Sequence, residues 1–152
     1  MRALIQRVRN ASVHVGGQPV GEIGPGLLVL LGVRKGDTTR EADWIADKLA
    51  ALRVFPDADG RMNRSVRDTG GEILVVSQFT LYGSLRKGTR PGFSQAAAPE
   101  HAEALYAHVV ARLEAALGRE VPTGRFGAHM EVRLANDGPV TLMIEREASA
   151  GG

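Results

Sequence analysis

Short apolar runs, separated by glycine, proline and polar turns, predict several β-strands along the chain. Residues 3–15 alternate partly between apolar and polar types and are rich in valine and isoleucine, which favours a strand. Gly16-Gly17 then predicts a turn into a hairpin. The almost wholly apolar residues 27–33 and 73–76 have the length and character of strands that are buried on both faces.

The last third of the chain shows a different strand pattern. Over residues 127–134, apolar side chains (Ala128, Met130, Val132 and Leu134) alternate with polar ones (His129, Glu131 and Arg133). Such alternation is typical of a strand with one solvated face. Residues 140–144 predict a further strand, and Asn136-Asp137-Gly138-Pro139 predicts a turn between the two.

Two segments show helical spacing. Apolar residues recur with a helical period over residues 39–53, after possible N-cap residues at 37–39. The second helix is predicted to start at Ala98-Pro99-Glu100 and to run to Leu117, with Gly118 as its C-cap. The polar residues 56–71 predict a loop or a short hairpin, and residues 83–98 predict a long surface connection.

These elements predict an α+β fold with a curved, mostly antiparallel or mixed, barrel-like sheet covered by two helices. The length of 152 residues and the 43% hydrophobic content fit one domain. We place that domain at residues 1–147 and a frayed C-terminal tail at 148–152.

Composition narrows the possible chemistry. The chain has no cysteine, which excludes disulfides and thiolate metal sites and favours a reducing compartment. No apolar stretch is long enough to cross a bilayer, so we expect a cytoplasmic protein without a membrane partner. The four histidines are scattered, and the sequence has no phosphate-loop, serine-elbow or zinc-protease motif. We therefore expect neither a metal nor a cofactor.

The net charge of +2 and the preference for arginine over lysine fit a protein that meets phosphate, although a genome's base composition also favours arginine. The basic residues of the irregular segments form two groups: Arg61, Arg64 and Arg67, and Arg86, Lys87 and Arg90. Either group is explained by contact with a phosphate backbone or by ordinary solvated loop charge.

Two segments carry polar or rigid groups that the strand pattern does not require. Residues 77–81, Ser-Gln-Phe-Thr-Leu, follow an apolar strand, so their hydroxyl and amide groups either find partners within the protein or face a ligand. Residues 136–141, Asn-Asp-Gly-Pro-Val-Thr, contain a Gly-Pro bond that is either a plain turn or a rigid functional loop.

Together these two segments resemble the SQFTL and N-x-GPVT signatures of the D-aminoacyl-tRNA deacylase family. The resemblance extends over nearly the whole chain. It includes the opening residues 1–8, the central KGTRPGFS at 87–94 and the stretch TGRFGA at 123–128.

The resemblance implies hydrolysis of the ester bond of D-aminoacyl-tRNA, and of glycine mischarged on tRNA(Ala), by a homodimer. A cis Gly138-Pro139 bond would reach from one subunit into the active site of the other and reject L-amino acids by steric clash. The catalytic segment would be Ser77, Gln78, Phe79 and Thr80, with the main-chain N–H groups of Phe79 and Thr80 stabilising the oxyanion. Substrate-binding residues would be Gly138, Pro139, Arg7, Phe126 and Met130, with Arg7 bracing the Gly-Pro segment.

Alternatives remain open at two points. The attacking water is activated by the ribose 2′-hydroxyl of the substrate, or Thr80 acts as a covalent nucleophile with a nearby base. The chain as a whole is an enzyme, a non-catalytic tRNA- or RNA-binding dimer module that uses its basic loops, or a structural dimerisation domain. The 5% aromatic content gives an RNA-binding module few side chains for base stacking.

Overall fold

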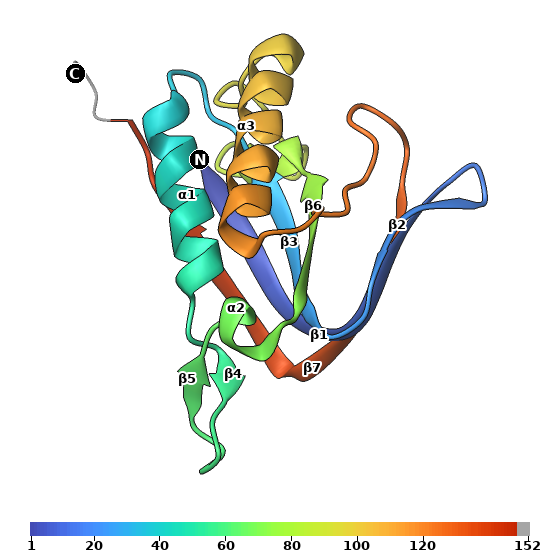
Figure 1. Ribbon diagram of the computed structural model, residues 1–152. Helices are drawn as coiled ribbons and strands as arrows, with labels where there is room; N and C mark the ends of the chain where they lie inside the picture. Colours follow the sequence, from blue (N-terminus) through green and yellow to red (C-terminus); the bar gives the residue numbers. More distant parts are fainter. Residues whose placement is uncertain (149–152) are drawn as a thin grey trace.

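A strongly curled five-stranded sheet forms the centre of the computed structural model, which describes residues 1–148 (Figure 1). The strand order is β2-β1-β3-β6, and β7 pairs with β1 as well. The five strands are β1 (Arg2–Val15), β2 (Gln18–Ile23), β3 (Gly26–Gly32), β6 (Glu72–Ser77) and β7 (Glu131–Glu145). All pairs are antiparallel except β3 with β6, which is parallel. The predicted α+β fold with a curved, mixed sheet is confirmed.

The curl follows from the way β1 is shared between partners. Its first half, Arg2 to Val8, pairs with β3, and its second half, Ala11 to Val15, pairs with β2. β7 pairs along both halves. The predicted hairpin after β1 is confirmed, with both Gly16 and Gly17 at positive φ.

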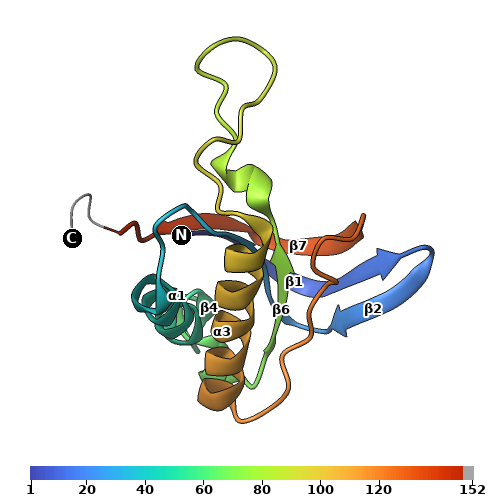
Figure 2. The ribbon, with the colours of Figure 1, turned by 90° about the horizontal axis from the view of Figure 1, so that it is seen from above.

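Two long helices lie side by side on one face of the sheet (Figure 2). Helix α1 (Thr39–Ala51) starts at a capping box of Thr38 and Glu41, and it ends two residues before the predicted residue 53. Helix α3 (Pro99–Leu117) has its predicted limits, with Gly118 as a left-handed C-cap. Their apolar sides pack on the sheet in one core, which includes Ile5, Val29, Ile45, Leu49, Val75, Val109 and Leu113.

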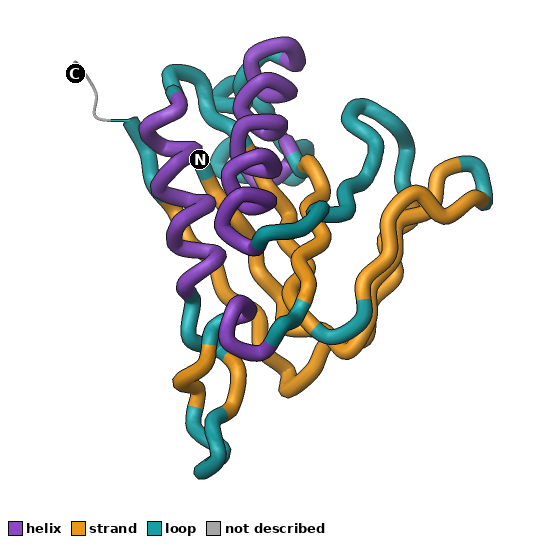
Figure 3. The backbone as a smooth tube through the Cα atoms, in the orientation of Figure 1, coloured by secondary structure: helices purple, strands orange, loops and turns teal. Residues whose placement is uncertain are grey.

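Two short helical turns were not expected from the sequence (Figure 3). The polar segment at 56–71 contains the predicted hairpin, formed by β4 (Phe55–Pro56) and β5 (Met62–Arg64), and then α2 (Val66–Thr69). Ser65 and Asp68 form a capping box that starts α2. The other turn, the 3₁₀ helix η1 (Phe79–Tyr82), directly follows β6.

The predicted turn at residues 136–139 is wrong, because β7 continues through it in one direction. Asn136 lies opposite Val8 and Thr141 lies opposite Gln6, so residues 137–140 all face Arg7. We call residues 137–140 the Gly-Pro bulge. Both arms of β7 pair with the same long strand, and the extra residues therefore bulge outward instead of reversing the chain. The arm before the bulge also starts later than predicted, at Glu131 instead of residue 127.

The other face of the sheet carries a second apolar cluster. Its buried members include Val13, Leu28, Leu74 and Val76. Met130, just before β7, packs against this cluster. The sheet is therefore covered on both faces near the end of β6.

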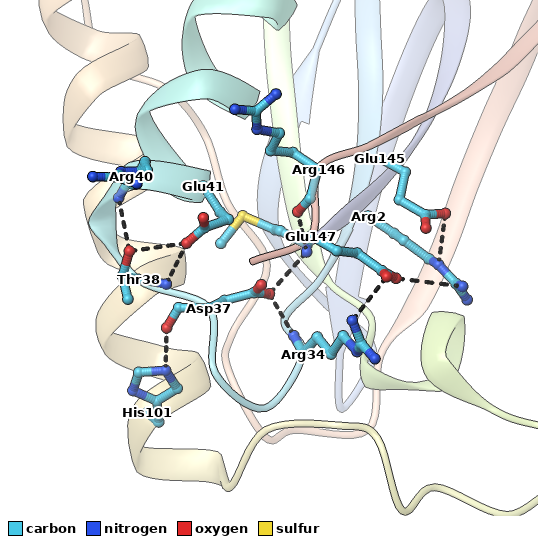
Figure 4. Close-up of polar contacts among 11 residues, drawn as sticks. Arg2, Arg34, Asp37, Thr38, Arg40, Glu41, His101, Glu145, Arg146 and Glu147 are labelled. Carbon is cyan, nitrogen blue, oxygen red and sulfur yellow. Dashed lines mark hydrogen bonds and ion pairs between the residues drawn. The ribbon is translucent and has the colours of Figure 1, made fainter. Parts of the chain in front are cut away.

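A buried ion pair joins the start of β1 to the start of α1 (Figure 4). The Met1 ammonium group lies 2.8 Å from Asp37 Oδ2, and both side chains are fully buried. The ammonium also donates to the carbonyl of Arg146 at 2.6 Å, and Arg34 N donates to Asp37 Oδ2 at 2.7 Å. The Met1 ammonium thus joins the loop before α1 to the end of the chain segment that follows β7.

The predicted tail at 148–152 lies outside the described residues except for Ala148. Within residues 1–148, no helix has the length and apolar character needed to cross a membrane.

Replacing Asp37 with alanine should lower the free energy of unfolding by about 3–5 kcal/mol, because it leaves a buried ammonium group without its counter-charge. Asp47→Ala is the matched control, since Asp47 pairs with Arg112 at 2.8 Å on the surface. That variant should lose less than about 1 kcal/mol. Urea denaturation with linear extrapolation measures both. Equal losses in the two variants would contradict a stabilising role for the buried pair.

Candidate active site

A cavity of about 570 Å³ opens at the carboxyl end of β6. Its walls come from five parts of the chain: the end of β3, the end of β6 with the start of η1, the segment that leads into α3, the first turns of α3, and the segment that leads into β7. The lining includes Ser77, Gln78, Phe79, Tyr106, Phe126 and Met130. The lining is largely apolar with a few polar groups, which is typical of a small-molecule site.

The chain turns sharply at the floor of this cavity. Gln78 N donates to Leu31 O at 2.8 Å, which extends the β3–β6 pairing by one step. The chain then enters η1, where Leu81 N donates to Gln78 O at 3.2 Å and Gly83 N to Thr80 O at 2.9 Å. The first N–H groups of a helical turn have no acceptor within that turn. Those of Phe79 and Thr80 are therefore available to a ligand.

Tyr82 anchors η1 to the start of β1. Its side chain is fully buried, and this burial, together with the nearby Asp37 carboxylate, raises the pKa of its hydroxyl. The Arg2 guanidinium lies 4.5 Å from the centre of the Tyr82 ring, and Arg2 Nη1 donates to Leu81 O at 2.9 Å. The turn that carries Phe79 and Thr80 is thus held by fixed parts of the fold.

The Thr80 hydroxyl is paired with an amide and not with a base. Gln78 Nε2 donates to Thr80 Oγ1. Within residues 1–148, neither Ser77 nor Thr80 forms a hydrogen bond with an imidazole or a carboxylate. Tyr106 Oη donates to Val75 O at 2.9 Å, and burial raises the pKa of Tyr106 to about 12. The tyrosine is therefore a neutral hydrogen-bond donor at physiological pH and not a base.

The segment before β7 forms the opposite wall. The rings of Tyr106 and Phe126 lie 6.0 Å apart, and Arg125 N donates to Met130 Sδ at 3.4 Å. Gly124 lies so close to Met130 that an added Cβ would come within 2.6 Å of the sulfur. Both residues expected from the sequence on this wall, Phe126 and Met130, are at the cavity.

The lining residues that the sequence did not indicate include three with ring side chains: Phe93, Tyr106 and His129. Tyr106 is on the apolar stripe of a predicted helix, where periodicity indicates only core. His129 fitted the wet face of a predicted strand, and Phe93 stood alone in a loop. No local pattern distinguished them, because the cavity joins segments that are distant in the sequence.

The Gly-Pro bulge is a separate and well-braced structure. The Gly138-Pro139 bond is cis and Gly138 has a φ of 137°. Arg7 Nε donates to Asp137 O at 3.1 Å, and Arg7 Nη1 donates to Val54 O at 2.7 Å. Asn136 Nδ2 donates to the carbonyls of Arg7 and Val140 at 3.1 and 3.0 Å. Gly138 and Pro139 themselves are exposed.

The bulge lies far from the cavity of its own chain. Ser77 pairs with Leu31, which pairs with Ala3, whereas the bulge faces Arg7. Three strand spacings and four residues along β1 separate the two sites by on the order of 20 Å. Of the residues expected at the site, the structure brings five to the cavity, with Thr80 beside them on η1: Ser77, Gln78, Phe79, Phe126 and Met130. Arg7, Gly138 and Pro139 lie together at the Gly-Pro bulge instead.

Solved structures show close likeness over the full chain. One titled "c-Myc DNA Unwinding Element Binding Protein" has a TM-score of 0.91 and 42% identity, covering 97% of this chain and all of that one. Another, titled as a probable eukaryotic D-amino acid tRNA deacylase, has a TM-score of 0.81. Its identity is 20%, over 94% of this chain and 97% of that one, so it speaks for the fold alone.

Sequence relatives give the family. A Salinibacter ruber protein named D-aminoacyl-tRNA deacylase is 60% identical over 148 residues, which cover 97% of this chain and 99% of that protein. A Symbiobacterium thermophilum protein of the same name is 58% identical over 147 residues, 97% of each chain. The family model described as D-Tyr-tRNA(Tyr) deacylase matches residues 4–145. The resemblance carried by the two signatures is confirmed, and the chain belongs to the D-Tyr-tRNA(Tyr) deacylase family.

Proposed function

We propose that this chain hydrolyses the ester bond of D-aminoacyl-tRNA and releases free D-amino acid and tRNA. The observation that carries the proposal is the family match over residues 4–145, in a chain whose SQFTL segment lines a cavity. Relatives at 58% and 60% identity are named D-aminoacyl-tRNA deacylase. A cytoplasmic location goes with this proposal, because the substrate is made there.

Main-chain groups of η1 carry the proposed chemistry. The oxygen of a water molecule adds to the ester carbonyl carbon, and the developing oxyanion accepts hydrogen bonds from the N–H groups of Phe79 and Thr80. The bond between the carbonyl carbon and the ribose oxygen then breaks. The ribose oxygen takes up a proton, which leaves tRNA with a free terminal hydroxyl. Gln78 helps to hold the terminal adenosine.

The ribose 2′-hydroxyl of the substrate is proposed to assist the attacking water. This assignment is supported by the hydrogen bonds at the site, in which the Thr80 hydroxyl pairs with the Gln78 amide and not with a base. A threonine nucleophile needs a neighbouring base to remove its proton. The Tyr106 hydroxyl, with its pKa of about 12, does not meet that need.

Selection between mirror-image substrates is proposed to come from the Gly-Pro bulge of a second copy of the chain. Main-chain atoms held by Arg7 and Asn136 offer a stiff barrier against the side chain of an L-amino acid. A D-amino acid directs its side chain elsewhere and glycine has none. Glycine mischarged on tRNA(Ala) would therefore also be hydrolysed.

A homodimer is part of this proposal, because the bulge lies on the order of 20 Å from the cavity of its own chain. Exposed apolar side chains on both arms of β7 favour contact with a second copy. Leu134 is 37% exposed, Leu142 41% and Met143 48%. Apolar residues grouped around an exposed loop are typical of an interaction surface.

A non-catalytic nucleic-acid-binding module is the second candidate. It is favoured by one observation, the similarity to the structure titled "c-Myc DNA Unwinding Element Binding Protein". A pure binder would retain aminoacyl-tRNA without releasing the amino acid. The two functions are therefore separated by product release.

Incubation with D-Tyr-tRNA should release free D-tyrosine, whereas L-Tyr-tRNA should remain charged. The ratio of the two hydrolysis rates should exceed about 100, because a fixed main-chain clash costs several kcal/mol. Quantifying the amino acid left on the tRNA over time measures both rates. Binding of D-Tyr-tRNA without release would favour the second candidate.

Thr80→Ala should retain hydrolysis of D-Tyr-tRNA within about tenfold of the unaltered protein. The substitution removes one neutral hydrogen bond, worth about 1 kcal/mol, and keeps the main-chain N–H group. Single-turnover rates measure the effect, and Thr80→Ser is the matched control. Complete loss in the alanine variant, with activity in the serine variant and tRNA binding in both, would instead identify Thr80 as a nucleophile.

Arg7→Met should weaken the discrimination between D- and L-Tyr-tRNA by about tenfold, because the bulge loses one charged hydrogen bond, worth about 1.5–3 kcal/mol. Arg9→Met is the control: Arg9 is 78% exposed and lies 3.8 Å from the Asp137 carboxylate. The measurement is the ratio of the two hydrolysis rates in folded protein. Equal ratios in both variants would show that bracing by Arg7 does not set the selectivity.

A further inference from the structure

A projecting loop stands next to the cavity. Ser84 and Gly92 close its base with two main-chain hydrogen bonds, of 2.8 and 2.9 Å. Residues 85–91 lie beyond this bridge, and we call them the basic loop. Figure 2 shows the loop extending well away from the helices and the sheet. All of its residues are exposed, so its side chains are open to a large partner.

The charge of this loop is unbalanced. Arg86, Lys87 and Arg90 are exposed, and none of them forms an ion pair within the part of the chain that the structure describes. No aspartate or glutamate occurs anywhere between Glu72 and Glu100. The loop therefore concentrates positive charge without local neutralisation, as a surface for phosphate groups requires.

The base of the loop is fixed to the wall of the cavity. Phe93, which follows the bridge, lines the cavity together with Phe79, and their ring centres lie 5.1 Å apart. The backbone of Gly83 lies so close to Phe93 that an added Cβ would come within 3.0 Å of the ring. The basic loop therefore projects from a segment that lines the cavity.

The other group of basic residues, in the β4–β5 hairpin and α2, differs from the basic loop in having acidic residues close by in the chain and in its position in the molecule. Arg61, Arg64 and Arg67, which we call the hairpin arginines, are preceded in the chain by Asp57 and Asp59 and followed by Asp68. Arg64 is used internally, since its Nη2 donates to Asp68 O at 2.8 Å. The β4–β5 hairpin lies at the opposite end of the molecule from α3's first turns (Figure 1). The hairpin arginines thus supply a control of equal formal charge.

We propose that Arg86, Lys87 and Arg90 bind the phosphate backbone of an RNA whose 3′ end lies in the cavity. This inference rests on the proposed function and names the contact that holds the body of the tRNA. The guanidinium and ammonium groups contact phosphate oxygens, which carry no base identity. The loop thus serves binding of any tRNA acceptor end, and discrimination between amino acids stays with the cavity.

The test compares two triple variants, each with arginine or lysine replaced by glutamine: Arg86→Gln, Lys87→Gln and Arg90→Gln in the basic loop, and Arg61→Gln, Arg64→Gln and Arg67→Gln in the hairpin. Each is assayed on D-Tyr-tRNA and on D-tyrosyl-adenosine, an ester that has no phosphate. We expect the basic-loop variant to lower kcat/KM for D-Tyr-tRNA, relative to that for D-tyrosyl-adenosine, by at least about tenfold at physiological salt. The hairpin variant should change this ratio less than about twofold.

Salt dependence gives a second measure of the same contact. For the unaltered protein, log(kcat/KM) on D-Tyr-tRNA should fall linearly with log salt concentration. In the basic-loop variant, the magnitude of the slope of this plot should be smaller by about 2 to 3. Each of the three lost phosphate contacts accounts for about 0.7–0.9 of that change. The hairpin variant should keep the original slope.

Three outcomes would overturn the inference: equal effects of the two variants on D-Tyr-tRNA, an unchanged salt slope in the basic-loop variant, or equal losses on both substrates. Equal losses together with a changed sedimentation coefficient would assign the loop to contact between subunits.

Failure of the proposed function would give a different result, since the unaltered protein would then hydrolyse neither ester. In that case the affinity of both variants for uncharged tRNA, measured by fluorescence anisotropy, still decides whether the loop binds RNA.

Discussion

The rest of the structure depends on the main-chain pairing of β1 with three antiparallel partners. β3 uses one half of β1, β2 uses the other, and β7 follows both, so the sheet has to curl around this strand. The ladder also explains the Gly-Pro bulge, because both arms of β7 are tied to β1 and the four residues between them have only Arg7 opposite. Arg7 then fixes the bulge through its hydrogen bond to Asp137 O. A single strand thereby sets the shape of the sheet and the position of its most exposed rigid loop.

The two family signatures lie in different parts of the sheet, one directly after β6 and the other midway along β7, opposite Arg7. At the end of β6, the start of η1 leaves the N–H groups of Phe79 and Thr80 without acceptors in the turn. At the bulge, the carbonyls of Asp137 and Val140 accept hydrogen bonds from the side chains of Arg7 and Asn136. Within residues 1–148, the hydroxyl groups of Ser77 and Thr80 have no imidazole or carboxylate partner. The sequence likewise contains no motif of paired catalytic side chains.

Charged side chains serve different purposes at the start of β1 and next to the cavity. The start of β1 is held internally by the buried pair of Met1 and Asp37, and Arg2 is used to clamp η1 through Leu81 O and the Tyr82 ring. The acid-free stretch between Glu72 and Glu100 contains both η1 and the basic loop. The charges at the start of β1 are thus paired or buried, whereas the three charges of the basic loop beside the cavity form no ion pair within residues 1–148.

The sequence by itself determined the two long helices, most of the strands, the fold class and the family. Local periodicity is sufficient for the elements, as the correct limits of α3 and the apolar strands β3 and β6 show. The family could be identified because each of its two signatures is contiguous in the chain. Only the tertiary structure decided that residues 136–139 do not form a turn, since a local turn signal cannot reveal that both flanking strands pair with β1. The tertiary structure alone showed that Tyr106 and His129 reach the cavity. It also showed that the two signatures lie on the order of 20 Å apart, and which of the two arginine groups lies near the cavity. Each of these depends on distances between segments far apart in the chain, and periodicity along the chain carries no information about such distances.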